Sequence, residues 1–456
     1  MDTYFHSVEL DQSLCKGCTN CVRRCPTEAI RVRNGKAFIL KERCIDCGEC
    51  IRICPHHAKK AIVSSFESFS KYKYLIALPA PALYAQFNNL QSPAPVISAL
   101  KSFGFDEVYE VAYAAEVVTS ATKQLMKAKT LKYPVISSAC PAVLRLIRVR
   151  FPELIDNILP LKSPAQYAGL DAKRIAMEKT GLTKEEIGTV FISPCPAKVT
   201  SSKNPLTSSE QYIDEVVAIR DIYPKLLPLM QVKAETQKEN ESKAGRDGIS
   251  WGKSGGESEA LYNDKYLAAD GIENVINVLE SLEDDKLKNI DFVELNACSG
   301  GCVGGVLTVE NPFVAKTRLK ILSNKRPINC YNCASSYPTE LNHDKKIEFL
   351  PVMQLDNDIK KASTKLKQIK EIEKRLCGLD CGSCGAPTCR ALAEDIVRGY
   401  ATEDYCVYRV NENVFKSNEQ EYGDLNLLPP AFRTDTSTRK LTEEMFRNGV
   451  DKDDGK

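Results

Sequence analysis

The sequence lacks several features that would indicate common classes of partner. Its 62 basic and 60 acidic residues leave a formal net charge of +2, so no overall positive field indicates a nucleic acid or an anionic membrane. Residues 1–14 have neither the basic start nor the apolar run of a signal peptide. The most apolar early stretch, residues 74–87, is too short to span a bilayer. We therefore expect a cytoplasmic protein.

Cysteine, by contrast, is abundant. The chain has 19 cysteines against four histidines and one tryptophan, and at 456 residues it does not need disulfides to be stable. In a reducing compartment such thiols usually bind metal or take part in chemistry. They fall into an N-terminal zone, four dispersed positions and a C-terminal zone.

The N-terminal zone repeats one motif. The spacing x2, x2, x3 followed by proline occurs twice, as it does in bacterial two-cluster ferredoxins, where the fourth cysteine of each run binds the other cluster. We therefore expect one 4Fe-4S cluster on Cys15, Cys18, Cys21 and Cys54, and a second on Cys44, Cys47, Cys50 and Cys25. A pair of zinc sites is the alternative, and it would not require this internal repeat.

Residues 74–300 alternate apolar runs of strand type with amphipathic stretches of helix type. This succession predicts an α/β domain with largely parallel sheets. The expected strands are 74–79, 107–113, 133–137, 189–193 and 291–297, and the expected helices include 114–129, 164–179 and 271–283. The polar stretch 233–258 is predicted to be a surface insertion or flexible loop. Its segment GISWGKS, residues 248–254, has one residue too few between its glycines for a phosphate-binding P-loop.

The four dispersed cysteines follow three of these strands. SSACP follows YPVIS, SPCPAK follows TVFIS and NACSGGC follows DFVEL, which places Cys140, Cys195, Cys298 and Cys302 at strand ends. Ligand sites in open α/β sheets lie outside the carboxyl ends of strands, so these thiols can converge on one buried cluster. Four unrelated buried cysteines are the alternative.

These segments resemble the three signature segments of the iron-iron hydrogenases, over about residues 10–325. The resemblance implies a 4Fe-4S cubane on Cys140, Cys195, Cys298 and Cys302. It also implies that Cys302 bridges to a diiron unit carrying CO, cyanide and an azadithiolate, together called the H-cluster, and that Lys198 contacts a cyanide. Further positions that match cofactor-facing residues of the family are Leu78, Pro79, Ala80, Lys162, Ser163 and Pro164.

The chain departs from this family where protons are transferred. Ala139 stands where prototypical members carry a proton-passing cysteine, and other relay positions fall at Thr122, Leu125 and Leu159. Ser193 and Asn296 replace methionines that pack on the diiron unit. A positioned proton-transfer group typically contributes about 10²–10⁴-fold in rate, so we expect slow turnover. The pattern is similar to the sensory branch of the family.

The C-terminal zone includes CGSCGAPTC. Its cysteines Cys381, Cys384, Cys389 and Cys406 resemble those of a small iron-sulfur module of bacterial electron-transfer complexes and corrinoid proteins, which implies a third accessory 4Fe-4S cluster. A zinc site is the alternative. Cys330, Cys333 and Cys377 fit another cluster, a thiol pair or simple burial equally well. Residues 356–374 are rich in lysine and have a helical period.

We thus expect an α+β ferredoxin-type domain over residues 1–70, an H-cluster domain over 71–328, a small helical iron-sulfur module over 329–412 and a polar tail over 413–456. The expected function is slow, reversible cleavage of H₂ and relay of electrons through 4Fe-4S clusters, as a sensor of H₂ or redox state. The expected partners are H₂, maturation factors for the diiron unit and an unidentified ferredoxin-like or signalling protein, with no nucleic acid or membrane. A non-catalytic iron-sulfur carrier or assembly factor, and a subunit of an electron-bifurcating complex, are the alternatives.

Overall fold

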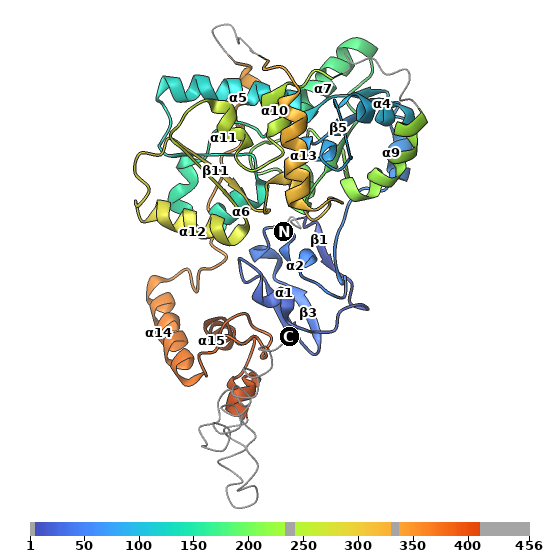
Figure 1. Ribbon diagram of the computed structural model, residues 1–456. Coiled ribbons are helices and arrows are strands. Elements are labelled where there is room, and N and C mark those ends of the chain that lie inside the picture. The colour runs from blue at the N-terminus through green and yellow to red at the C-terminus, as the bar shows by residue number, and fades with distance from the viewer. Residues whose placement is uncertain (1–4, 233–241, 330–336, 411–456) are drawn as a thin grey trace, which may run out of the picture. The chain divides into compact units, whose positions relative to one another are not determined.

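The computed structural model describes residues 5–232, 242–329 and 337–410 (Figure 1). It forms two compact units. The larger unit runs to Met353 except for Arg31–Arg33, which belong with the chain from Gln354 onward in the smaller unit. Residues 337–353, which the sequence analysis assigned to the C-terminal module, thus lie in the larger unit. Cys330, Cys333 and the predicted polar tail lie outside the described residues.

The structure contains both helices and strands throughout the larger unit. The strands are β1 (Val8–Leu10), β2 (Ile30–Arg33), β3 (Lys36–Ile39), β4 (Lys59–Ala61), β5 (Tyr74–Pro79), β6 (Glu107–Val108), β7 (Val135–Ile136), β8 (Ile187–Ser193), β9 (Glu215–Ala218), β10 (Tyr266–Asp270) and β11 (Phe292–Asn296). The α-helices are α1 (Asn20–Arg23), α2 (Glu49–Arg52), α3 (Pro81–Tyr84), α4 (Ala94–Phe103), α5 (Val111–Ala128), α6 (Pro141–Arg150), α7 (Pro164–Thr180), α8 (Pro196–Lys203), α9 (Ile219–Val232), α10 (Arg246–Ser250), α11 (Gly256–Leu261), α12 (Ile272–Glu283), α13 (Pro312–Asn324), α14 (Ile359–Arg375) and α15 (Cys389–Val397). Within the described ranges, no helix has both the length and the apolar character needed to cross a bilayer.

Two parallel sheets form the centre of the larger unit. One has the strand order β6-β5-β8-β9 and the other the order β10-β11-β7, and all their pairings are parallel. Every residue of β8 is buried, which explains the continuous apolar run of its sequence. The α/β class with parallel sheets is therefore confirmed. The predicted strand 107–113 was too long, because the chain leaves the sheet after Val108 and begins helix α5 at Val111.

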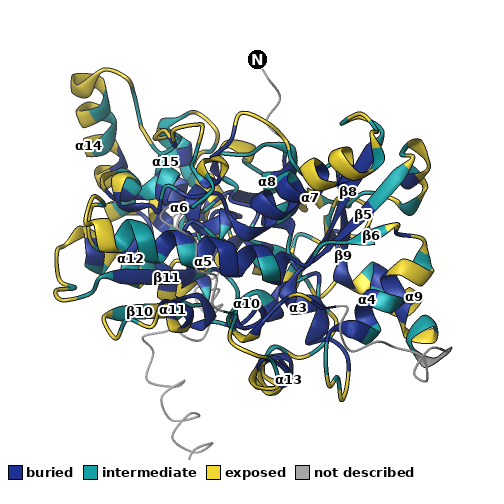
Figure 2. Ribbon diagram, turned by 90° about the horizontal axis from the view of Figure 1, so that it is seen from above, coloured by how far each residue is buried: buried dark blue, intermediate teal, exposed yellow. Residues whose placement is uncertain are grey.

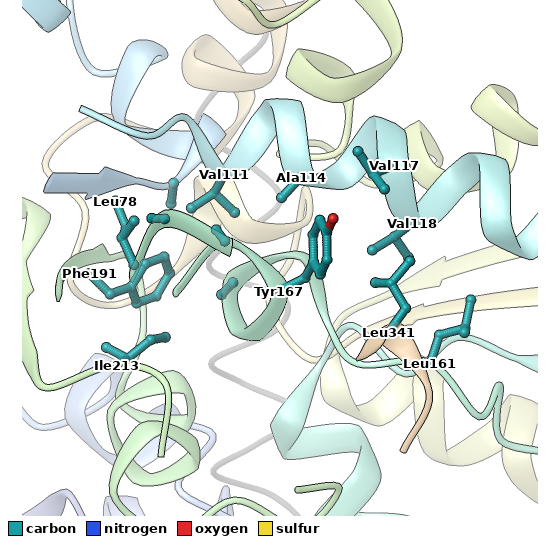
Figure 3. Close-up of a cluster of buried hydrophobic side chains, with 14 of the residues drawn as sticks. Leu78, Val111, Ala114, Val117, Val118, Leu161, Tyr167, Phe191, Ile213 and Leu341 are labelled. Atoms are coloured by element: carbon teal, nitrogen blue, oxygen red, sulfur yellow. The ribbon is translucent and has the colours of Figure 1, made fainter. Parts of the chain in front are cut away.

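Helices pack against both sheets and close the core. Val111, Val118 and other residues of α5 meet the ring of Tyr167 from α7 and the side chains of Leu78 and Phe191 from the sheet (Figure 3). Figure 2 shows β8, β9 and β11 as buried, whereas α4, α9 and α13 each expose one side. This packing fixes the strands, and so it also fixes the loops that follow their carboxyl ends.

The ferredoxin-type region is part of the larger unit and packs on its strand-end loops. In this region β1 pairs with β4 in antiparallel fashion. The hydroxyl of Ser7 donates to the carbonyl of Pro196 at 2.8 Å. Gly48 has a φ of 83°, and a Cβ there would lie 2.6 Å from Val306. The same Cβ would lie 3.1 Å from Pro196, the first residue of α8, so only glycine fits where the second cysteine run meets the helix that follows β8.

Residues 242–258 correct the prediction of a surface loop. Ser242, Ala244, Ile249 and Glu257 are buried. The polarity of this segment misled the sequence analysis, because its backbone amides are satisfied by buried carboxylates rather than by water. Glu110 accepts hydrogen bonds from the amides of residues 243 and 244, and Glu116 from those of residues 245 and 248.

The smaller unit contains α14 and α15 and is held by a buried ion pair. Asp395 on α15 accepts from Arg31 at 2.7 and 3.1 Å and from Arg33 at 2.8 Å. Both Arg31 and Asp395 are buried. Bidentate arginine–carboxylate geometry of this kind is strong because both hydrogen bonds are charge-assisted.

Replacing Asp395 with Asn should destabilise the smaller unit by about 3–5 kcal/mol, because Arg31 would then be a buried charge without its partner. Limited proteolysis of the chain under anaerobic conditions measures this effect as faster cleavage beyond residue 353. The matched control is Asp356→Asn, which removes the partly exposed pair with Lys365 and should leave the cleavage rate nearly unchanged. Equal cleavage rates for the two variants would contradict the assignment.

Candidate metal centre

Three strand ends from the two sheets deliver the four dispersed cysteines. Cys140 follows β7 and is the N-cap of α6, and Cys195 follows β8 and is the N-cap of α8. Cys298 follows β11, and Cys302 begins the next short 3-10 helix. Proline at the first position of α6 and of α8 starts each helix directly after its cysteine.

The four thiols lie close enough to influence one another electrostatically. Burial raises the pKa of Cys298 well above its usual value, and the charges of Cys195, Cys140 and Cys302 raise it further. Burial also raises the pKa of Cys195 to about 12. Sulfurs in such a setting remain protonated unless a cation compensates their charge, and a cluster of iron ions supplies that compensation. The donor set therefore fits an iron-sulfur cube.

A cavity with about 50 Å³ of free space lies beside Cys302. Its walls come from seven regions of the chain that are distant in sequence, and they are mainly apolar. The lining side chains include Ala80, Val111, Ala139, Phe191, Lys198, Trp251, Glu257, Glu294, Asn296 and Cys302. The cysteine predicted to bridge to the diiron unit is thus the one dispersed cysteine on the wall of this cavity.

Lys198 supplies positive charge to the cavity. Its ammonium group donates to the carbonyl of Ala139 at 3.1 Å. Burial alone would lower the pKa of Lys198, but the charges of the four cysteines raise it above its usual value. The residue predicted to contact a cyanide ligand is therefore a partly buried cation on the cavity wall, which suits an anionic ligand.

Several other predicted cofactor-facing side chains do not line the cavity. Leu78 packs in the core, and Ser163 forms a capping box with Gln166 at the start of α7. From the same two predicted segments, Ala80 and Pro164 do line the cavity, next to Pro81 and Ala165. Pro79, Lys162 and Ser193 are likewise absent from the lining, and the hydroxyl of Ser193 donates to the carbonyl of Cys195.

The positions expected for the family's proton relay hold either an apolar side chain or a hydroxyl that already donates a hydrogen bond. Leu159 is fully buried in the core, and Leu125 packs against the same core. Thr122 is also buried, and its hydroxyl donates to the carbonyl of Val118 at 2.9 Å. None of these three side chains provides a proton path to the cavity in the part of the chain that the structure describes.

The cavity is also lined by two buried carboxylates, which the sequence analysis missed. Glu257 accepts a hydrogen bond from Ser137 at 2.6 Å, and Ser137 in turn accepts from the amide of Ala139 at 3.2 Å. Glu294 accepts from Asn296 at 2.9 Å. Burial and the neighbouring charge of Glu294 raise the pKa of Glu257 to about 8. The pair therefore retains a proton near neutral pH.

The ferredoxin-type cysteines form the two sets expected from their spacing. Burial raises the pKa of Cys21 to about 11, and the charges of Cys18, Cys54 and Cys15 raise it further. In the second set, burial and then the charge of Cys25 raise the pKa of Cys47. The fourth cysteine of each run thus lies with the other run. Backbone amides four residues later donate to the sulfurs of Cys25 and Cys54 at 3.2 and 3.3 Å, in a matching way.

His6 and Asp46 lie beside this second set. The ring of His6 and the carboxylate of Asp46 are 2.9 Å apart, and their polar atoms and the sulfur of Cys44 lie within 4.8 Å of one another. Asp46 also accepts from the amide of Val8 at 3.2 Å. Because Cys44 belongs to the predicted second cluster, we assign His6 and Asp46 as its polar neighbours.

The second ferredoxin set also lies next to the dispersed cysteines. Cys47, Cys140 and Cys195 pack against one apolar core cluster. The guanidinium of Arg52, two residues after Cys50, donates to the carbonyl of Gly304 at 2.6 Å, and its charge acts on Cys298. The two predicted metal sites are therefore neighbours within the larger unit.

The C-terminal cysteines gather in the smaller unit. Burial raises the pKa of Cys384, and the charges of Cys381 and Cys406 raise it further, against a backbone hydrogen bond at Ala386 that lowers it. Cys377, which the sequence analysis left unassigned, lies with Cys389 and Cys406, and burial raises its pKa to about 12. Five thiols therefore share the region in which four were predicted to hold a cluster.

Comparison with protein families agrees with this arrangement. The family described as iron only hydrogenase large subunit, C-terminal domain, matches residues 73–306. The chain belongs to this hydrogenase family. A 4Fe-4S dicluster domain matches residues 7–55, and an Fe-S cluster family matches residues 376–408. The iron-sulfur character of all three cysteine zones is thereby supported.

The curated relatives include hydrogenases and assembly factors. Iron hydrogenase 1 of Clostridium pasteurianum is 24% identical over 402 residues, which cover 71% of this chain and 70% of the relative. The NADP-reducing hydrogenase subunit HndD of Solidesulfovibrio fructosivorans is 26% identical over 330 residues, 67% of this chain and 50% of that protein. The cytosolic Fe-S cluster assembly factor NAR1 of Candida dubliniensis is 25% identical over 122 residues, 26% of this chain and 21% of that protein.

Solved structures of similar proteins are more distant in sequence. An FeFe-hydrogenase solved in connection with oxygen inactivation of the H cluster is 18% identical, with a TM-score of 0.45, and the match covers 61% of this chain and 95% of that one. A structure of HydA describing stepwise assembly of the H-cluster is 17% identical, with a TM-score of 0.42 and coverage of 61% and 95%.

The carboxylate pair makes a direct prediction about protonation. Infrared spectra at pH 7 should show the C=O stretch of a buried protonated carboxylic acid, and this band should disappear as the pH rises through about 8. In the Glu257→Gln variant the loss of the band near pH 8 should be absent, because the group that titrates there is gone. Glu259→Gln, two residues away on an exposed side chain, is the control and should retain this step. A step near pH 8 that survives in Glu257→Gln would contradict the assignment.

Proposed function

We propose that this chain is a hydrogenase of low turnover that binds an H-cluster and cleaves H₂ slowly and reversibly. The observation that carries the proposal is that Cys302 alone, among four converging and partly buried cysteines, lines a cavity that Lys198 also lines. When bound there, the diiron unit would supply the centre at which H₂ is split. Four cysteine sulfurs would hold the cube, and Lys198 would balance the negative charge of cyanide ligands.

The residues around the cavity support slow proton exchange. Ala139 lines the wall and has only a methyl group, so it transfers no proton. Glu257 and Glu294 are the carboxyl groups of the cavity, and the shared proton of this pair is available near neutral pH. We propose that the pair replaces the family's usual relay, at lower efficiency because Ser137 stands between Glu257 and the backbone of residue 139.

Electrons would travel through the ferredoxin-type clusters. The second set, Cys44, Cys47, Cys50 and Cys25, lies beside the dispersed cysteines, and the charge of Cys21 from the first set acts on Cys50. This succession gives a wire of single-electron carriers from the cavity outward. We propose that its far end meets a ferredoxin-like or signalling protein in the cytoplasm, and that slow turnover suits reporting H₂ or redox state.

A non-catalytic assembly factor is the second candidate. Its support is the match to NAR1, which is named as a cytosolic Fe-S cluster assembly factor. The match to HndD, named as a subunit, likewise favours a larger hydrogenase complex as a further context. The three candidates differ in whether a diiron unit is present and in whether a flavin-binding partner copurifies.

Infrared spectroscopy after maturation with the diiron unit tests the proposal. We expect bands from CO and cyanide ligands, and we expect them to shift when H₂ is admitted. Lys198→Ala should change the cyanide bands, because the buried ammonium group would be gone. Absence of CO and cyanide bands in chain that has full iron-sulfur loading would reject hydrogenase chemistry and favour the assembly factor.

Restoring the missing relay group should raise turnover. Ala139→Cys places a thiol on the cavity wall, and we expect H₂ evolution to rise about tenfold or more, within the contribution of a positioned proton-transfer group. Ala139→Val is the control, because it adds similar bulk without a transferable proton. Equal rates for the Cys and Val variants would show that proton transfer at this position does not limit turnover.

A further inference from the structure

The larger unit has a second hollow, called the groove below. Residues 250–257 contribute side chains both to this groove and to the metal-centre cavity. The groove is lined by residues of α10, α11 and α13, of which α10 packs beside α13 (Figure 1). Its volume of about 480 Å³ is within the range of small-molecule sites. The function proposed above makes no use of it.

Uncompensated positive charge lines this groove. The side chains of Arg246, Lys316 and Lys320 have no hydrogen-bond or ion-pair partner among the described residues. The two carboxylates of the groove are already engaged. Both oxygens of Asp247 accept from the hydroxyl of Tyr262 at 3.0 Å, and Glu259 pairs with Lys253 at 2.5 Å. The groove therefore favours an anion with several charges.

The remaining lining adds hydroxyl donors and aromatic rings. Ser250 and Ser254 line the groove, and they offer O–H donors of the kind that phosphate oxygens accept. Phe313 and Tyr262 also line it, with 70% and 62% of their surfaces exposed. Aromatic side chains stack on nucleobases with little preference for sequence. Phosphate groups and a planar ring occur together in a nucleoside polyphosphate.

We propose that this groove binds a nucleoside polyphosphate, with the phosphates at Arg246, Lys316 and Lys320 and the base against Phe313. The site is not a P-loop. Gly248 lies inside α10, where a Cβ would be 1.9 Å from the carbonyl of Ala112, so its backbone is packed against α5 rather than open to a phosphate. Side chains, and not a backbone cradle, would hold the ligand.

The groove is connected to the metal centre through one short segment. Trp251 and Glu257 line the metal-centre cavity. Lys253 and Ser254, which lie between these two residues in the sequence, line the groove. The amide of Ser254 donates to the carbonyl of Gly300 at 3.0 Å, in the loop between Cys298 and Cys302. A nucleotide that moves Ser254 would therefore also move that loop. This regulatory consequence rests on the proposed function, whereas binding itself does not.

Calorimetric titration of the full chain with its iron-sulfur clusters, under anaerobic conditions, tests the proposal. ATP and inorganic pyrophosphate are the probes. We expect saturable ATP binding at micromolar concentration that weakens with added salt. We also expect the emission of Trp251, the single tryptophan of the chain, to change on binding in protein not yet loaded with the diiron unit. Neither measurement depends on hydrogenase activity.

Paired charge reversals locate the site. Lys316→Glu with Lys320→Glu should weaken ATP binding at least tenfold. Lys345→Glu with Lys346→Glu is the control, since it changes the net charge equally on exposed residues outside the groove. Phe313→Ala should weaken binding of ATP but not of pyrophosphate. No saturable ATP binding, equal losses in the two double variants, or pyrophosphate binding as tight as ATP would overturn the proposal of a nucleotide site.

Discussion

The structure depends on keeping four thiols together where water cannot stabilise their charge. Cys140, Cys195, Cys298 and Cys302 reach one place only because β7, β8 and β11 belong to parallel sheets whose carboxyl ends meet. Burial raises the pKa of Cys195, Cys298 and Cys302, so the site is stable with ionised sulfurs only when a cationic metal cluster is bound. The packing of the helices, the ferredoxin-type region and the segment after residue 242 all serve to close this site.

This chain retains the cysteines expected to bind the electron-carrying clusters, but not the residues of the family's proton relay. The cysteines that would carry electrons are all present, and the second ferredoxin set packs beside the central one. Of the four positions of the family's proton relay, Ala139, Leu125 and Leu159 hold no transferable proton, and the hydroxyl of Thr122 donates to the carbonyl of Val118. Glu257 and Glu294 provide the cavity with a different pair of carboxyl groups. This combination is the basis for the slow, reversible H₂ exchange that we propose.

The sequence was most informative where chemistry requires a fixed spacing. The two ferredoxin runs predicted which cysteine would lie with the other run, and the strand that ends before Cys195 was found where the apolar run predicted it. It was least informative where polar residues are buried. Residues 242–258 have the composition of a loop but are largely buried. Glu110 and Glu116, more than a hundred residues earlier, accept hydrogen bonds from backbone amides of this segment, and its own sequence does not show this. Glu294 was visible only as a charge inside a strand, and its partner Glu257 lay in the segment interpreted as a loop.

Anomalous X-ray scattering at the iron edge, from anaerobic crystals of the cluster-loaded chain, tests the central claim most directly. The account predicts a compact iron peak bounded by Cys140, Cys195, Cys298 and Cys302, in addition to peaks at both ferredoxin-type sets. Iron at the ferredoxin-type sets with none between the four dispersed cysteines would contradict it.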